Sequence, residues 1–208
     1  METHGKRAPR VPRAVREQQM LDAAVAVFAR RGYRATSMDE IAVAAGVSKP
    51  LVYLYLKSKD ELFAACVRRE AGALSAAVRA AVETGAPPDR QLWSGLLGFF
   101  RHTAEHRDGW TLLHGHARSS GAPSGEEVAA MRVEIVDFVT SLIGSAARAA
   151  PCGPRLPEDE ARGLALALVG AAESLAGSSL GGREAAATLM NFAWAGLGNL
   201  LTGVTWAP

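Results

Sequence analysis

The sequence has only two cysteines and few runs of β-branched residues, and each shortage excludes a class of protein. Cys66 and Cys152 lie far apart and match no disulfide or zinc-binding spacing. There is no alternation of apolar and polar residues that would predict β-strands, and no internal repeat. With 49% hydrophobic and 21% charged residues over 208 positions, the composition is that of a globular protein, and the many alanines favour helices.

Targeting segments and common catalytic motifs are also missing. The first 16 residues carry five basic side chains but no apolar stretch, which excludes a secretory signal and predicts a cytoplasmic protein. Residues 185–208 are uncharged over the length of a membrane span, yet asparagine, threonine and glycine dilute them. We interpret this stretch as a buried helix and expect no membrane partner. Without a GxSxG, P-loop or HExxH motif, we expect no enzymatic activity and no cofactor, with a helical enzyme as the less favoured alternative.

Positive charge is concentrated near the N-terminus. Residues 1–60 contain 11 Lys or Arg and 6 Asp or Glu, a net charge of +5, whereas residues 61–208 carry −3. A basic segment on a mildly acidic body indicates that this end meets a polyanion. Residues 1–12 contain two prolines and read as a flexible basic arm. Three arginines in or beside the arm can reach phosphates or a minor groove, namely Arg7, Arg10 and Arg13.

Apolar periodicity and helix-capping signals predict an all-α fold of about nine helices. The first helix is expected to end at Gly32, and capping boxes at Ser37, Ser58 and Ser124 begin three others. The predicted helices cover residues 13–31, 37–45, 49–55, 58–82, 89–106, 110–117, 124–149, 158–177 and 184–203.

Two of these helices are joined by a tight turn at Gly46, which is typical of a helix-turn-helix. Ala42 is small enough to let the two helices pack closely, and Val52 fills the space between them. Ser48 can cap the second helix, whose first turn holds Pro50. Any pair of packed helices needs similar residues, so this pattern alone leaves DNA binding open.

The residues around this turn resemble the N-terminal domain of the tetracycline-repressor (TetR) family. The segment from Gly32 to Phe63 reads GYRATSMDEIAVAAGVSKPLVYLYLKSKDELF. It shares with the family the Gly-Tyr-x-Ala-Thr-Ser, the Ile-Ala-x-Ala-Ala-Gly-Val-Ser-Lys, the Tyr-x-Tyr and the Ser-Lys-Asp-Glu-Leu-Phe. The match covers about 50 residues with the first helix included, and residues 64–208 match only in length and helical pattern. The resemblance implies a DNA-binding domain over 13–58 and a ligand-binding and dimerisation domain over 59–208.

The resemblance also implies a DNA-contacting face on this segment. The residues agree with it, because Ser37 at a helix N-terminus suits a phosphate, and Lys49 and Tyr53 lie four apart on one helix face. Alternatives remain open for Ser37 as a cap only, for Lys59 as a solvated charge and for one tyrosine as a core residue. The predicted DNA-contacting residues are Thr36, Ser37, Ser48, Lys49, Pro50, Leu51, Tyr53, Tyr55 and Lys59.

Three residues depart from the family pattern. Pro50 and Leu51 stand where members often have a small residue followed by threonine or alanine, and we expect them to alter which bases are read. Leu56 replaces a common phenylalanine and should only repack the core.

Aromatic and aliphatic residues cluster in the middle of the larger domain, where they form either a packed core or, as the resemblance implies, a pocket for a small apolar or amphipathic ligand. Glu173 lies on an otherwise uncharged helical face, so a buried carboxylate there needs an arginine or a dimer partner. The predicted pocket residues are Trp93, Leu96, Leu97, Phe100, Trp110, Leu113, His114, Met131, Ile135, Phe138 and Glu173.

A metal site and a redox sensor are weaker interpretations. His102 and His106 have the i, i+4 spacing of metal ligands, but no cysteine or carboxylate cluster accompanies them, so we expect no metal. Cys152 in a loop is an oxidant-sensor candidate, although a lone loop cysteine is usually inert.

The last two helices have long, nearly uncharged faces that a single chain does not need, which predicts a homodimer. Two-fold symmetry would pair two DNA-reading helices with a palindromic operator. We therefore predict a transcriptional repressor released from DNA by a small ligand, with an activator or a ligand-independent regulator as alternatives. The predicted interface residues are Leu164, Leu168, Ala171, Leu175, Leu189, Phe192, Gly196 and Leu200.

Overall fold

Nine α-helices and no strand occupy the residues that the computed structural model describes, which are 12–116, 125–149 and 156–201. The predicted all-α class is confirmed. Most of the basic arm, with Arg7 and Arg10, and also Ser124 and Cys152 lie outside the described residues. The helices are α1 (Arg13–Ala35), α2 (Met38–Ala44), α3 (Lys49–Leu56), α4 (Lys59–Ala81), α5 (Pro88–Glu105), α6 (Arg107–His116), α7 (Gly125–Ala149), α8 (Glu158–Ala176) and α9 (Gly182–Leu201).

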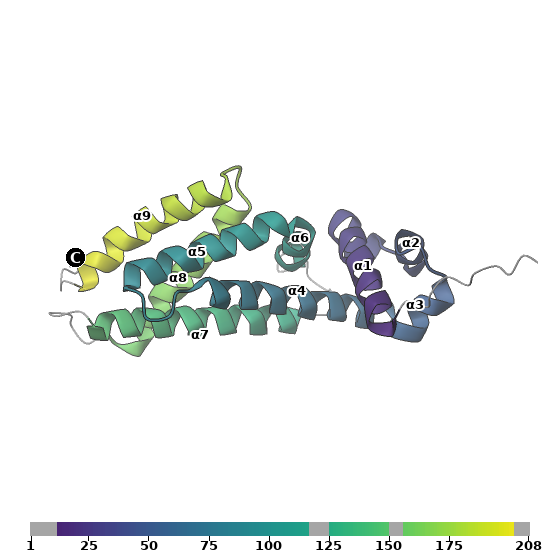
Figure 1. Cartoon of the computed structure of the whole chain (residues 1–208), viewed down its shortest axis with the longest axis horizontal. Coiled ribbons are helices and arrows are strands. Elements are labelled where there is room, and N and C mark those ends of the chain that lie inside the picture. Colours follow the sequence, from purple (N-terminus) through teal and green to yellow (C-terminus); the bar gives the residue numbers. More distant parts are fainter. Residues whose placement is uncertain (1–11, 117–124, 150–155, 202–208) are drawn as a thin grey trace, which may run out of the picture.

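The helices form an elongated molecule with a small head at one end (Figure 1). The head consists of α1, α2 and α3, and the long helix α4 leads from it into the body, where it runs beside α7 (Figure 1). In the body, α5 packs between α4 and α9, and α7 packs against α8. The short helix α6 lies against α1 and α4, so it bridges the head and the body.

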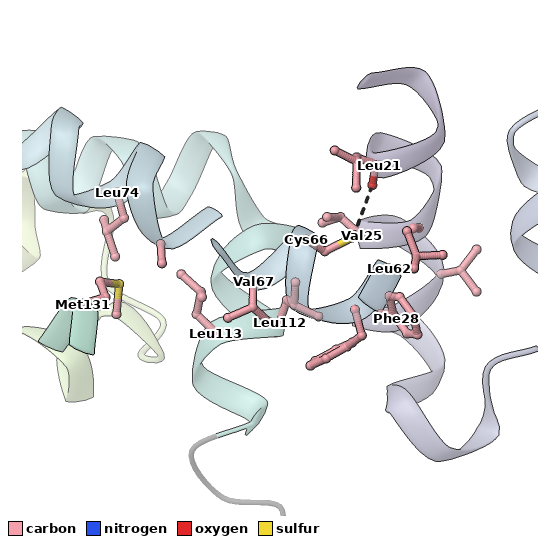
Figure 2. Close-up of a cluster of buried hydrophobic side chains, with 14 of the residues drawn as sticks. Leu21, Val25, Phe28, Leu62, Cys66, Val67, Leu74, Leu112, Leu113 and Met131 are labelled. Atoms are coloured by element: carbon pink, nitrogen blue, oxygen red, sulfur yellow. Dashed lines mark hydrogen bonds between the residues drawn. The ribbon is translucent and has the colours of Figure 1, made fainter. Parts of the chain in front are cut away.

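One hydrophobic core connects the head with the body. It extends from Met20 in α1 to Leu189 in α9, and a smaller cluster lies between α7 and α8. Figure 2 shows the part around Cys66 of α4, whose thiol points at the carbonyl oxygen of Leu21 at 3.9 Å. Burial raises the pKa of the Cys66 thiol to about 12, so this cysteine serves as a small apolar residue.

The start of the head follows the sequence pattern closely, with one difference at the end of α1. Gly32 has the left-handed φ of 76° and interrupts α1 as predicted, but a further helical turn continues to Ala35. The Ser37–Glu40 capping box is present, with the Glu40 amide 3.2 Å from the Ser37 hydroxyl and the Ser37 amide 3.0 Å from the Glu40 carboxylate.

The predicted side-chain cap by Ser48 is wrong. A cap accepts from the second or third amide of its helix, but Pro50 has no N–H and the amide of Leu51 donates to the backbone carbonyl of Ser48 at 3.0 Å. The start of α3 is therefore stabilised by proline at the second helical position, and not by a side-chain cap.

The described part of the uncharged C-terminal stretch, residues 185–201, belongs to α9, where Ala185, Ala186 and Leu189 pack into the core. Among the described residues, no helix has the length and apolarity needed to cross a membrane.

Candidate nucleic-acid interface and effector cavity

The turn between α2 and α3 has the geometry of a helix-turn-helix. Gly46 adopts a φ of 63°, a conformation that glycine reaches without steric cost. The amide of Val47 then donates to the carbonyl oxygen of Ala42 at 3.0 Å, which closes the turn. Ile41, Ala42 and Val52 are buried between the helices, so the packing is as the sequence predicts.

The outer face of α3 is open to solvent. Val52 and Leu56 point into the core, while Lys49, Pro50, Tyr53 and Leu54 are exposed and Leu51 is half-buried. Leu54 is 71% exposed, although the sequence analysis did not include it among the DNA-contacting residues. Because it lies four residues after Pro50, both side chains are on one face of the helix. The ammonium group of Lys49 pairs with the Asp39 carboxylate of α2 at 2.9 Å.

Two residues that the sequence places at the DNA-contacting face are turned toward α1 instead. Thr36 is 3% exposed, and its hydroxyl donates to the carbonyl oxygen of Gly32 at 2.8 Å. The Lys59 ammonium group donates to the carbonyl oxygens of Tyr33 and Thr36 at 2.9 and 3.0 Å and lies over the Tyr33 ring. Carbonyl groups at a helix C-terminus lack helical partners and attract a cation, so Lys59 fastens the start of α4 to the end of α1.

Of the remaining residues predicted to contact DNA, some are exposed and others make contacts within the head. Ser37 and Ser48 are exposed, and the Ser37 side chain is engaged in its capping box. Tyr55 is half-buried, and the guanidinium group of Arg13 lies 5.0 Å from the centre of its ring. Of the predicted DNA-contacting residues, Thr36, Tyr55 and Lys59 have structural contacts in the free protein.

A cavity of about 230 Å³ lies in the body and is lined mainly by residues of α4, α5, α7 and α8. Along α7, its lining extends from Met131 to Ala147, which at 1.5 Å per residue corresponds to ~24 Å. The walls are aliphatic and aromatic except for Gln91, Glu160 and Glu173. Six predicted pocket residues line it: Leu96, Trp110, Met131, Ile135, Phe138 and Glu173.

Five predicted pocket residues lie outside this lining. Phe100 and Leu113 are closed inside the core at 2% and 3% exposure. Leu97 packs against the same core, Trp93 faces Arg183 of α9, and His114 stacks on the ring of Trp110. The sequence missed the far end of the cavity, formed by Leu142, Ala146 and Leu156, because apolar periodicity does not reveal how far a helix is rotated about its axis.

Glu173 pairs with an arginine, which is one of the two partners that the sequence analysis expected for a buried carboxylate. The Nε atom of Arg132 in α7 donates to both carboxylate oxygens of Glu173 in α8, at 3.0 and 3.2 Å. This ion pair balances the charge of an acidic side chain in the cavity wall.

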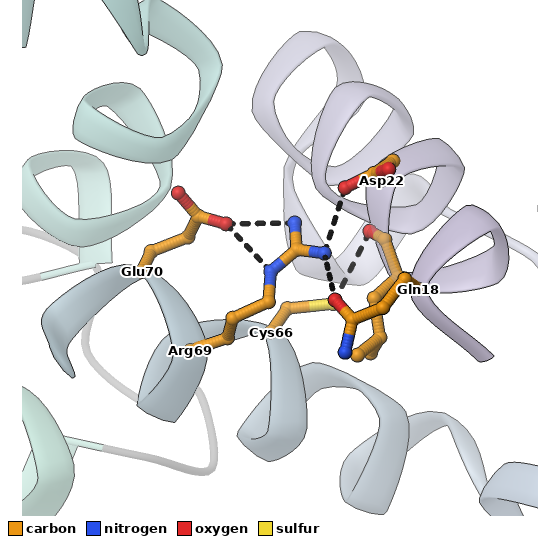
Figure 3. Close-up of polar contacts among 6 residues, drawn as sticks. Gln18, Asp22, Cys66, Arg69 and Glu70 are labelled. Carbon is orange, nitrogen blue, oxygen red and sulfur yellow. Dashed lines mark hydrogen bonds and ion pairs between the residues drawn. The ribbon is translucent and has the colours of Figure 1, made fainter. Parts of the chain in front are cut away.

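A polar junction connects the cavity region with the head (Figure 3). Arg69 of α4 donates to Asp22 of α1 at 2.7 Å and, through two nitrogen atoms, to Glu70 at 2.9 and 2.7 Å. Glu70 is buried against Gly109 of α6, where a Cβ atom would overlap the carboxylate. The next residue of α6, Trp110, lines the cavity, so the helix that forms part of the cavity wall also touches α1 directly and reaches it through Glu70 and Arg69.

The predicted dimer residues do not form one exposed surface. Leu168 and Leu189 are buried in the chain's own core, Leu164 and Leu168 line the cavity, and Ala171 and Leu175 are half-buried. Phe192 and Gly196 of α9 are exposed, Phe192 at 77%, and the side chain of Leu200 lies outside the described set. Leu166 of α8, at 42% exposure, is an apolar surface residue that the sequence analysis missed.

The histidine pair has no metal-site geometry among the described residues. The rings of His102 and His106 lie 4.4 Å apart, and no group of three or more potential ligands occurs there. Burial, and then the neighbouring His106, lowers the pKa of His102.

A helix-turn-helix head with an open third helix, joined to a helical body with an internal cavity, defines a DNA-binding transcriptional regulator. The family model for bacterial regulatory proteins of the tetR family matches residues 20–66, and the model for the tetracyclin repressor-like C-terminal domain matches residues 88–196. The chain belongs to the TetR family of transcriptional regulators.

Similar proteins agree with this assignment. A TetR-like regulator from Rhodococcus sp. RHA1 has a solved structure that is 40% identical with a TM-score of 0.78, over 91% of this chain and 99% of that one. The HTH-type transcriptional activator FasR from Mycolicibacterium smegmatis is 40% identical over 108 residues, 52% of this chain, and the chain spans about half of its length.

A third similar protein is known with a bound molecule. FadR from Bacillus subtilis, solved in complex with stearoyl-CoA, has a TM-score of 0.69 over 90% of this chain and 99% of that one. At 18% identity, this likeness establishes the shared fold alone.

Proposed function

We propose that this chain is a cytoplasmic homodimeric repressor that binds a palindromic operator and leaves it when a long apolar or amphipathic molecule enters the cavity. The observation behind the proposal is the position of the cavity next to the junction. Trp110 lines the cavity, while its neighbour Gly109 packs on Glu70, whose partner Arg69 bonds to α1.

The shape and chemistry of the cavity favour a long acyl chain as the effector. The lining is apolar along ~24 Å of α7, which suits an extended aliphatic chain better than a compact polar molecule. The stearoyl-CoA in the FadR structure is such a compound in a protein of the same fold. We therefore infer that the effector belongs to the long-chain acyl compounds.

The mechanism is a shift between two conformations of the dimer. In the free protein, the two copies of α3 fit the operator. A ligand that separates the cavity walls displaces α6, and α6 moves α1 and α4 through the Gly109–Glu70 contact and the Arg69 bonds. The ligand changes DNA affinity only by the difference in its affinity for the two conformations, which is typically ~1–3 kcal/mol in allosteric proteins.

The test measures operator affinity by fluorescence anisotropy, using a duplex selected from a random pool with the full-length protein. Stearoyl-CoA should weaken binding about 5- to 150-fold, while acetyl-CoA, which has the same head group without the long chain, should not. Raising the salt concentration should weaken binding steeply, because phosphate contacts release counterions.

A matched pair of variants on α7 assigns the effect to the cavity. Ile135→Trp fills the cavity and should abolish the response to stearoyl-CoA while preserving operator binding. Val133→Trp alters an exposed position on the same helix and should respond like the parent protein. Unchanged operator affinity with stearoyl-CoA bound in the cavity would contradict the proposed release.

A second candidate function is activation of transcription, because FasR, 40% identical over its matched part, carries the name of an activator. In vitro transcription from a template that contains the selected operator separates the two. Fewer transcripts on adding the protein support a repressor, and more transcripts support an activator.

A further inference from the structure

The DNA-contacting face of α3 has almost no hydrogen-bonding side chains. The helix reads KPLVYLYL, without arginine, asparagine, glutamine, serine or threonine. Because Val52 and Leu56 are buried, the face available to DNA consists of Lys49, Pro50, Tyr53 and Leu54, with Leu51 at its border.

The two polar side chains on this face offer little base-specific recognition. The ammonium group of Lys49 is held by Asp39 at 2.9 Å, although an exposed ion pair of this kind is weak enough for a phosphate to replace. Tyr53 presents a single hydroxyl group. The side chains that usually distinguish bases by bidentate contacts are arginine or lysine on guanine and asparagine or glutamine on adenine, and this face has only Lys49 among them, already engaged with Asp39.

The apolar side chains instead form a ridge of suitable size for the major groove. Pro50 and Leu54 are one turn apart, a rise of ~6 Å along the helix, which is close to two base-pair steps of 3.4 Å. Leu54 is 71% exposed in the free protein, so its burial against DNA would remove apolar surface from water. In the major groove, the apolar group on a base edge is the methyl group of thymine.

We propose that α3 recognises its operator chiefly through thymine methyl groups, with Pro50 and Leu54 as the specificity-determining residues. The occupant of this ridge is duplex DNA, because Lys49 begins the helix and exposed Lys57 follows it, which places positive charge at both ends. The inference rests on operator binding by α3 and specifies which chemical groups of the operator the helix reads.

The experiment replaces single thymines of the selected operator by deoxyuridine, which removes only the methyl group. At two neighbouring positions in each half-site, this replacement should weaken binding about fourfold, the effect of losing one buried methyl-sized group. Thymines in the flanking sequence serve as the internal control and should have no effect.

Protein variants identify the side chain that contacts each methyl group. In Leu54→Ala, deoxyuridine at one of the two positions should no longer weaken binding, because the contact is already lost. Leu54 is exposed, so this variant keeps the folded core. Val133→Ala, which shortens an exposed apolar side chain of α7, should keep the full deoxyuridine effect.

Two results would overturn the inference. Insensitivity to deoxyuridine at every position, together with a large loss on replacing guanine by 7-deazaguanine, would show that hydrogen bonds to purines provide the specificity. An unchanged deoxyuridine pattern in Leu54→Ala and Pro50→Ala would assign the methyl contacts to other residues. If the selection enriches no duplex at all, operator binding itself fails, which is distinguishable from either result.

Discussion

Arg69 and Glu70 are adjacent in sequence but connect different parts of the molecule. Arg69 bonds to Asp22 of α1, whereas the Glu70 carboxylate is buried against α6 and has Arg69 as its ion-pair partner. Arg69 therefore has two acidic partners, the exposed Asp22 and the buried Glu70. Such an arrangement is sensitive to loss of the arginine, because the buried carboxylate would remain without a cation.

We predict that Arg69→Met lowers the free energy of unfolding by about 1–3 kcal/mol, because the Glu70 carboxylate, whose side chain is only 11% exposed, loses its charged partner. Urea unfolding followed by circular dichroism measures the change. Arg68→Met removes the neighbouring exposed arginine, which pairs with Glu127 at 3.4 Å, and should cost less than about 1 kcal/mol. Equal losses in the two variants would contradict the role assigned to the junction.

His102 should make the stability depend on pH. Its pKa is lowered in the folded protein, first by burial and then by His106, so folding favours the neutral ring. The folded protein is thus most stable above the ordinary histidine pKa of 6.5 and loses stability as the pH falls toward the lowered value.

In His102→Gln, we expect the melting temperature to fall less between pH 7 and pH 5 than in the parent protein. Thermal unfolding at several pH values measures this dependence. Ala104→Gln changes an exposed neighbour without an ionisable group and should keep the parental slope. A parental slope in His102→Gln would assign the pH dependence to other groups.

Within the segment predicted to contact DNA, sequence reasoning identified the exposed face of α3 but not the contacts of every side chain. Lys49, Pro50 and Tyr53 are exposed as their spacing predicts, because one face of a short helix follows directly from the buried positions. Lys59 and Thr36 turn toward α1, which depends on carbonyl groups that become neighbours only after folding. Hydrogen bonds between elements distant in sequence leave no local pattern to detect.

Among the elements, α5 lies close against α4 at a glycine. A Cβ atom on Gly98 of α5 would overlap the methyl group of Ala81 in α4 and lie 3.3 Å from the carbonyl oxygen of Ala77. Two small residues at one crossing let the helix backbones approach, and α5 with α4 forms one wall of the cavity.

We predict that Gly98→Ala destabilises the protein by about 1–3 kcal/mol, because backbone and methyl groups have little freedom to move away. Gly72→Ala, in α4 with open space around it, should stabilise by about 0.5–1 kcal/mol through the better helix propensity of alanine. Chemical unfolding of both variants gives the two free energies. Stabilisation by both substitutions would mean that the crossing is loosely packed.

The order and approximate ends of the helices could be predicted because caps, glycines and apolar periodicity are local signals. The start of α6 at Arg107, three residues before the predicted position, is an exception in which Gly109 lies inside a helix because Glu70 requires space there. Only six of the eleven predicted pocket residues line the cavity, since the lining depends on the rotation of α5, α7 and α8 around their axes. Leu164 and Leu168 accordingly line the cavity although the sequence suggested an interface.

For the whole molecule, the exposed apolar residues of α8 and α9 are the best indication of a second copy. Phe192 is 77% exposed, and aromatic side chains are enriched at interfaces between protein chains. Large aromatic residues at the centre of an interface often contribute ~2 kcal/mol or more to association.

We expect the parent protein to be a dimer and Phe192→Asp to weaken the dimer about thirtyfold or more, because a charge would be buried at the interface. Sedimentation velocity over a range of protein concentrations measures the dissociation constant. Val133→Asp, at an exposed apolar position on α7, should leave the dimer unchanged. A monomeric parent protein, or a dimer that tolerates aspartate at position 192, would contradict the assignment.

The uninterrupted core from Met20 to Leu189 has a practical consequence for finding the effector. Because the head and the body share one core, they should unfold cooperatively. A ligand bound in the cavity should therefore raise the melting temperature of α1 and α3 together with that of the body. Compound collections can therefore be screened by thermal shift on the isolated protein, before any operator is known, and each hit ranked by the degrees that it adds.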